Sequence, residues 1–108
     1  MQQAIRIVVA AAVVLCCVIE AQAQTDSIDK GRQLAERLCA GCHLNKGQGE
    51  KIGPHGIPGF VAVANRSHQT PEGIVKWLKS LPPMMPNHHL TQDEMYALSD
   101  FIMSLRKE

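Results

Sequence analysis

The sequence predicts an all-α protein, and two observations carry that prediction. Three stretches place apolar residues at 3–4-residue spacing, which is the period of an amphipathic helix. Between the first and second lies a segment, residues 44–70, with so much glycine and proline that it excludes a long helix or a central strand. No strand pattern is convincing and no internal repeat is found, so we expect about three main helices with short helical turns.

Length and charge narrow the class further. A chain of 108 residues and 11.8 kDa forms one domain, and its formal net charge of +1 excludes the basic field of a nucleic-acid-binding protein. Aromatic residues, which usually fill a small core, make up only 4 %. Another group must therefore supply much of the apolar volume of the core.

Residues 1–23 resemble a secretory signal peptide. Arg6 precedes an apolar run over residues 7–19, and small residues in Ala21-Gln22-Ala23 match a cleavage site. The run falls short of the roughly 20 residues of a spanning helix. We expect cleavage before Gln24, which divides the chain into a signal peptide (1–23) and a mature domain (24–108).

Two alternatives stay open for this segment: an uncleaved membrane anchor, and a lipoprotein modified at Cys16 or Cys17. After cleavage the mature chain keeps only Cys39 and Cys42, in an exported and oxidising compartment.

The first helix is predicted from about Ser27 to Leu38, with Asp26 or Ser27 as its cap. Its apolar stripe is Ile28, Gly31, Leu34, Ala35 and Leu38. Gly31 costs about 1 kcal/mol relative to alanine inside a helix. It is either a tolerated defect or the place where another helix crosses too closely for a side chain.

A short helical turn is expected around residues 60–64. The second main helix should begin at Pro71, capped by Thr70, and end before Pro82-Pro83. Its predicted buried stripe is Ile74, Trp77, Leu78 and Leu81.

The third main helix has the clearest start, because Thr91-Gln92-Asp93-Glu94 reads as a capping box. Leu90 can pack onto Met95 as a hydrophobic staple. Its stripe continues through Leu98, Phe101, Ile102 and Leu105.

Cys39-Ala40-Gly41-Cys42-His43 is a C-x-x-C-H motif, the attachment signature of c-type haem. One turn of backbone places two thiols beneath the two vinyl groups of the porphyrin, and each forms a thioether. The next residue, His43, then lies below the iron and can ligate it through Nε2.

Other interpretations of the motif are weaker. A disulfide between Cys39 and Cys42 closes a short ring that is usually redox-active, and a thioredoxin-like dithiol needs a βαβ setting. A zinc site needs two more ligands, and adjacent His88-His89 is poorly spaced to supply them. A covalent haem also explains the aromatic shortage and gives the glycine- and proline-rich segment a surface to wrap.

The sixth iron ligand is expected from Leu81-Pro82-Pro83-Met84-Met85-Pro86, where prolines stiffen the loop and a thioether can be aimed at the iron. Three alternatives remain: the methionines as core filler, an open sixth position, or ligation by one of the other histidines, His55, His68, His88 and His89.

The chain resembles a small bacterial class I c-type cytochrome over nearly all of residues 24–108. The resemblance rests on the C-x-x-C-H motif, Gly53-Pro54, Met85-Pro86 and the segment from Leu98 to Ile102. It implies an all-α class I cytochrome c fold wrapped around one covalent haem c.

The resemblance also implies roles for single residues. Gly31 packs against the C-terminal helix near Leu98 and Phe101. The carbonyl of Pro54 accepts a hydrogen bond from Nδ1 of His43. Met85 rather than Met84 is the axial ligand, because Pro86 follows it and Leu90 comes five residues later.

Haem binding is therefore predicted for Cys39, Cys42, His43, Met85 and Pro54, with His43 and Met85 on the iron. Trp77 is either a core residue or a hydrogen-bond donor to a haem propionate.

The predicted function is one-electron transport between exported, periplasmic partners, with no catalytic residue. The partners would be a dehydrogenase, a cytochrome complex or a terminal oxidase, and a membrane only if the signal segment is uncleaved. Docking is expected at the thioether edge, near Lys46 and Lys51.

One alternative is a haem-bearing subunit of a dehydrogenase or oxidase complex, favoured if Phe60, Val61 and Val63 are exposed. A haem enzyme or gas sensor is a further alternative, and it needs a free sixth position.

Overall fold

The computed structural model describes residues 1–43 and 56–107, and its regular elements within those ranges are all helical. Along the chain they are α1 (Gln2–Leu34), the π-helix η1 (Ala35–Cys39), α2 (Phe60–Ala64), α3 (Pro71–Lys79) and α4 (Gln92–Ser104). The all-α prediction is confirmed.

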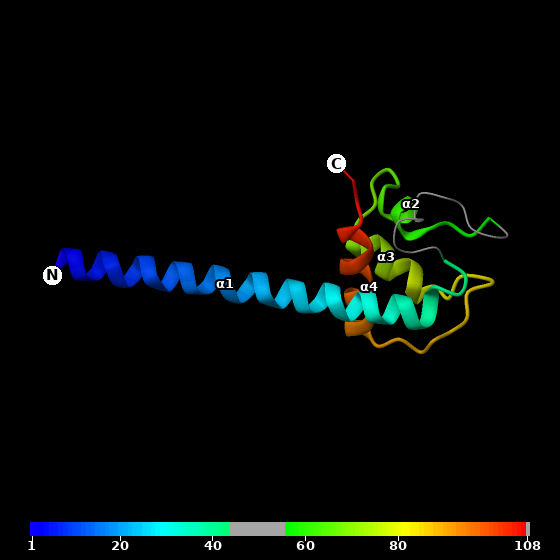
Figure 1. The fold of residues 1–108 in the computed structure, drawn as a ribbon, viewed down its shortest axis with the longest axis horizontal. Helices are drawn as coiled ribbons and strands as arrows, with labels where there is room; N and C mark the ends of the chain where they lie inside the picture. The colour runs from blue at the N-terminus through cyan, green and yellow to red at the C-terminus, as the bar shows by residue number, and fades with distance from the viewer. Residues whose placement is uncertain (44–55, 108) are drawn as a thin grey trace.

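Helix α4 is the centre of the domain, because α1, α2 and α3 all pack against it. Figure 1 shows α4 crossing the C-terminal part of α1 at a steep angle, while the N-terminal part of α1 projects away from every other helix. The core combines residues from all four α-helices and η1: Leu34, Ala35, Phe60, Ala64, Ile74, Ala97, Leu98, Phe101 and Ile102.

The first helix begins far earlier than predicted, and its α-helical part ends at Leu34, with the π-helix η1 continuing to Cys39, one residue past the predicted end at Leu38. It starts at Gln2 and passes through the predicted cap without a break, so neither Asp26 nor Ser27 caps it. Instead, the Ser27 hydroxyl donates to Asp100 Oδ2 at 2.6 Å and ties α1 to α4. The predicted stripe is confirmed: Gly31, Leu34 and Ala35 are buried, and Ile28 and Leu38 pack partly buried against the core.

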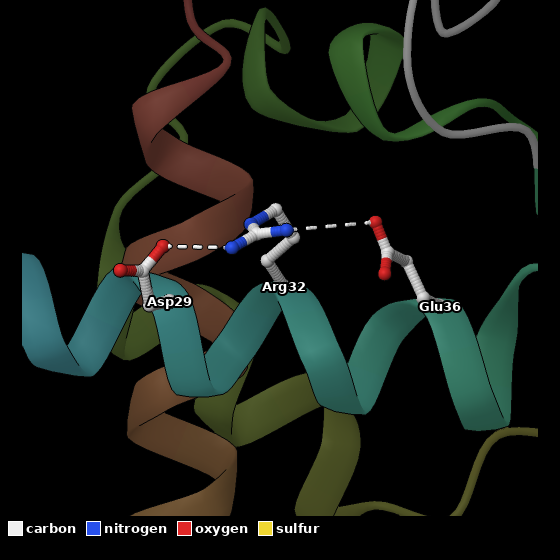
Figure 2. A network of polar contacts seen from close by, with 3 residues as sticks. All are labelled: Asp29, Arg32 and Glu36. Carbon is white, nitrogen blue, oxygen red and sulfur yellow. Dashed lines mark hydrogen bonds and ion pairs between the residues drawn. The ribbon is translucent and has the colours of Figure 1, made fainter.

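Two exposed ion pairs share Arg32 and run along α1 into η1 (Figure 2). Arg32 lies 3.0 Å from Asp29 Oδ1 and 4.0 Å from Glu36 Oε1, so it links α1 to the start of η1. Exposed pairs at this spacing contribute only about 0.3–0.5 kcal/mol each. The helix therefore depends on its packing against α4.

The apolar N-terminal part of α1 is exposed, with large side chains such as Ile7, Val14 and Ile19 facing outward. Together with η1 it forms a helix long and apolar enough to cross a membrane, and its position at the N-terminus equally fits a signal sequence. The helix runs on through residues 20–27 without a break, past the charged side chains of Glu20 and Asp26.

The caps of α3 and α4 confirm their sequence signals. The Thr70 hydroxyl accepts from Gly73 N, with Pro71 in the first turn. Thr91 and Glu94 form the full capping box: Glu94 N donates to Thr91 Oγ1 at 3.2 Å, and Thr91 N donates to Glu94 Oε2 at 2.9 Å. The predicted stripe of α4 is buried at Leu98, Phe101 and Ile102.

The predicted stripe of α3 is only partly correct. Ile74 is buried, but Val75 is buried with it, while Trp77 and Leu81 are 56 % and 57 % exposed. Helix α3 ends at Lys79, and Leu81 adopts a positive φ of 49°, so it has left the helical register. The interpretation of Trp77 as a core residue is therefore wrong.

Candidate functional site

The C-x-x-C-H motif forms a tight turn at the end of η1. The carbonyl of Cys39, the last residue of that π-helix, accepts hydrogen bonds from Cys42 N at 3.1 Å and His43 N at 2.8 Å. The first cysteine is thereby held on the rigid helix, and the second cysteine and the histidine return beside it within one turn of backbone.

Both thiols of the motif are free, with Cys39 half-buried and Cys42 exposed. Burial of Cys39, together with the nearby Cys42, raises the pKa of the Cys39 thiol to about 11. Cys39 therefore stays protonated at neutral pH. A protonated, half-buried thiol is a poor nucleophile, so Cys39 lacks the lowered pKa that is typical of a reactive dithiol.

The imidazole of His43 is oriented by a backbone carbonyl. Its Nδ1 lies 2.8 Å from the carbonyl oxygen of Pro58. Because a carbonyl only accepts, Nδ1 must carry the proton, and the lone pair is then on Nε2. The hydrogen bond to Pro58 thus leaves Nε2, the nitrogen that would ligate a haem iron, without a proton.

Pro54, for which the resemblance implied this contact, lies outside the described residues. In the structure the carbonyl of Pro58 accepts the hydrogen bond from His43 Nδ1, which is the contact that the resemblance implied for Pro54. Both prolines belong to the same glycine- and proline-rich segment, and Gly53-Pro54 was chosen from the family pattern alone.

A ring contact that the sequence analysis missed lies on the face of the same imidazole. The His43 and Phe60 rings are stacked, with centroids 5.1 Å apart and planes at 16°. Phe60 in turn meets Phe101 of α4 edge-on, at 6.4 Å and 90°. Both phenylalanines are only 4 % exposed, so the motif is tied to the core through Phe60.

The two candidate axial methionines differ in how far they are exposed to solvent. Met84 adopts a positive φ of 71° and is 92 % exposed. Met85 is half-buried, and its N–H donates to the Pro82 carbonyl at 3.2 Å. Within the part of the chain that the structure describes, no hydrogen bond joins this loop to the Cys39–His43 turn.

The remaining candidates that the structure describes are exposed. His68, His88 and His89 are exposed, and Trp77 presents most of its surface to solvent. His55, Lys46 and Lys51 lie outside the described residues. Across residues 1–43 and 56–107 there is no group of three or more His, Cys, Asp or Glu side chains that could hold a metal ion, which disfavours the zinc interpretation there.

The residues present fit a covalently attached haem. Two free thiols, one turn of backbone and an imidazole protonated on Nδ1 are the donor set that haem c takes from a protein. Cys39 and Cys42 would hold the porphyrin edge, and His43 would ligate the iron.

Comparison with known proteins agrees with this assignment. Residues 26–102 match the family described as cytochrome c oxidase, cbb3-type, subunit III. The chain is 33 % identical over 76 residues to a protein named cytochrome c-552 from Bradyrhizobium diazoefficiens, covering 70 % of this chain and 72 % of that protein. No solved structure matches the chain significantly.

Proposed function

The chain belongs to the cytochrome c family that includes subunit III of cbb3-type cytochrome c oxidases, and we propose that it shuttles single electrons between periplasmic redox proteins with His43 and Met85 as its axial ligands. Its function is electron transport through a c-type haem. The bound haem c supplies the iron that takes up and releases the electron. The observation that carries the proposal is the Nδ1 contact of His43 with Pro58, which leaves Nε2 for the iron.

Met85 is the proposed sixth ligand. It is half-buried in a loop framed by prolines, and its backbone is held by the Pro82 carbonyl, whereas Met84 is almost fully exposed. A thioether ligand favours the ferrous state and raises the potential, and a stiff loop keeps the ligand on the iron in both oxidation states. These are the needs of an electron carrier, which has no catalytic residue in this proposal.

Electron exchange is proposed at the edge of the site near Cys42. Cys42 is exposed while Cys39 is half-buried, so the second thioether would be the nearer to a docked partner. The small net charge of +1 predicts weak electrostatic steering. The partners proposed are a dehydrogenase, a cytochrome complex or a terminal oxidase.

A permanently bound subunit is the second candidate, and the description of the matching family as an oxidase subunit supports it. An exposed apolar patch at residues 60–63 would favour it, but Phe60 and Val61 are buried and Val63 packs against the core. This burial supports the freely diffusing carrier. Haem protein that elutes as a monomer from the exported fraction would agree, and constant co-elution with an oxidase or dehydrogenase would favour the subunit.

Axial ligation is tested by a matched pair of variants. Met85→Ala should abolish the far-red sulfur-to-iron absorption band of the ferric protein and lower its potential. Met84→Ala, the control at the neighbouring exposed position, should keep the band. Loss of the band only in Met84→Ala would shift the assignment by one residue, and its absence from the wild type would indicate another sixth ligand.

A further inference from the structure

We infer that Phe60 is a positioning residue for the axial imidazole of His43, one that fixes the plane of the ring as the Pro58 carbonyl fixes its edge. The inference rests on the proposed ligation by His43. It assigns to the start of α2 a task in setting the electronic structure of the bound iron.

The hydrogen bond to Pro58 leaves one motion of the imidazole free. It anchors Nδ1 at 2.8 Å from the carbonyl oxygen, but the side chain has two rotatable bonds, Cα–Cβ and Cβ–Cγ, and one distance does not fix both. A combined rotation about these bonds changes the direction of the imidazole plane while the hydrogen bond keeps its length. A second contact, on the face of the ring, is needed to stop it.

Phe60 supplies that second contact. Its ring lies against the imidazole with the planes only 16° apart and the centroids 5.1 Å apart, so tipping of His43 would drive the imidazole into the phenyl face. Offset stacking of this kind is a favoured arrangement of aromatic rings. One contact is on the edge of the imidazole and the other is on its face, so together they restrain the ring plane more than either does alone.

The phenyl ring is itself held from behind. Phe60 is 4 % exposed and meets Phe101 edge-on at 6.4 Å, and Phe101 belongs to the helix against which α1 packs. A single residue, Gly59, separates Pro58 from Phe60, and it is the N-cap of α2. One short segment thus carries both constraints and is fixed in the core.

The plane of an axial imidazole controls how unpaired electron density spreads over the porphyrin of a low-spin ferric haem. The four haem-methyl proton shifts and the largest g-value therefore report it. In the haem-loaded wild-type protein we expect nuclear Overhauser contacts between the His43 and Phe60 ring protons in the diamagnetic ferrous state. Phe60→Leu should change the spread of haem-methyl shifts and shift or broaden the largest g-value of the ferric protein.

Phe101→Leu is the matched control. It removes the same ring from the same core at a position that touches Phe60 but has no ring contact with His43. We expect it to lower stability while leaving the methyl-shift pattern close to that of the wild type. A purely structural role for Phe60 would instead make both variants alike.

Three results would overturn the inference: no His43–Phe60 ring contact in the wild type, an unchanged shift pattern in Phe60→Leu, or an equal change in Phe101→Leu. If Phe60→Leu yields no holoprotein, the wild-type ring contacts decide alone. Failure of the proposed ligation is distinguishable, because the wild-type ferrous protein would then lack the strongly upfield-shifted ring protons of an iron-bound histidine.

Discussion

Gly31 of α1 lies directly against the backbone of Ala97 in α4. A β-carbon built on Gly31 would overlap the Ala97 carbonyl oxygen and would come within 2.8 Å of Phe101 Cβ. The close-crossing interpretation of this glycine is confirmed. The neighbour on the other helix is Ala97 together with the expected Phe101.

Gly31→Ala should therefore destabilise the protein. Overpacking against a rigid backbone costs about 1–3 kcal/mol, which outweighs the gain of about 1 kcal/mol in helix propensity. At the upper end of the overpacking cost, the net loss in the free energy of unfolding is about 2 kcal/mol. Denaturant unfolding of the holoprotein measures this loss.

Gly73→Ala is the control for this prediction. At Gly73 the nearest atoms to a new β-carbon are Gln69 Oε1, at the end of a flexible side chain, and Thr70 Oγ1, which caps α3, at 3.2 and 3.3 Å, so a shift of a few tenths of an ångström makes room. Its stability should stay level or rise slightly. Equal losses in the two variants would show that glycine at position 31 is not needed for a close contact.

The capping box of α4 should contribute in a pH-dependent way. Thr91→Ala should lower the free energy of unfolding by about 1 kcal/mol near neutral pH, as is typical for loss of an N-cap side chain. The hydrogen bond from the Thr91 backbone N–H holds the pKa of Glu94 below its usual 4.5. The contribution of Glu94 is thus present above pH 4.5 and is lost as the pH falls through the lowered value.

Unfolding of wild type and Glu94→Gln between pH 7 and pH 3 checks this sign. The difference between them should shrink as the pH falls. A difference that grows in acid would mean that the carboxylate does not cap the helix.

Covalent attachment should consume both thiols of the motif. Acidified organic solvent should fail to extract the haem, and the denatured mature holoprotein should react with no thiol reagent. Cys39→Ser should leave a single thioether at Cys42, visible as a haem-bearing peptide that contains only that bond. Labelling of Cys39 or Cys42 in wild-type holoprotein would contradict two-point attachment.

Processing of the N-terminus is the next prediction. The apolar run is short and ends at a good cleavage site, so we expect a mature protein that begins at Gln24 and carries one haem. The intact mass should show both changes. Full-length chain in the membrane fraction would instead indicate that α1 remains as an anchor, which its continuous helix would allow.

The elements that sequence predicted well are those with local start and stop signals. Helix α4 follows from its capping box, and α3 from Thr70, Pro71 and the proline pair beyond its end. Cap chemistry acts within one turn, so it needs no tertiary knowledge. The α1 boundary was predicted poorly because residues 20–27 contain no helix breaker.

The parts that sequence predicted poorly depend on contacts between distant segments. Trp77 was placed in the core because its spacing matched the stripe, but α3 turns Val75 inward, and a nine-residue helix buries only one narrow face. The Pro58 and Phe60 contacts with His43 span fifteen residues or more across a glycine-rich segment, where no periodic pattern exists to reveal them.

Carbon monoxide binding tests the central claim most directly, because a carrier must keep both axial ligands through the redox cycle. Prolines on both sides of Met84-Met85 limit how far the loop can swing, so the thioether should stay in place. We expect the ferrous protein at neutral pH to bind carbon monoxide poorly while it exchanges electrons readily with small mediators. Rapid, stoichiometric binding by the native ferrous form would contradict the carrier function and would favour a haem enzyme or gas sensor.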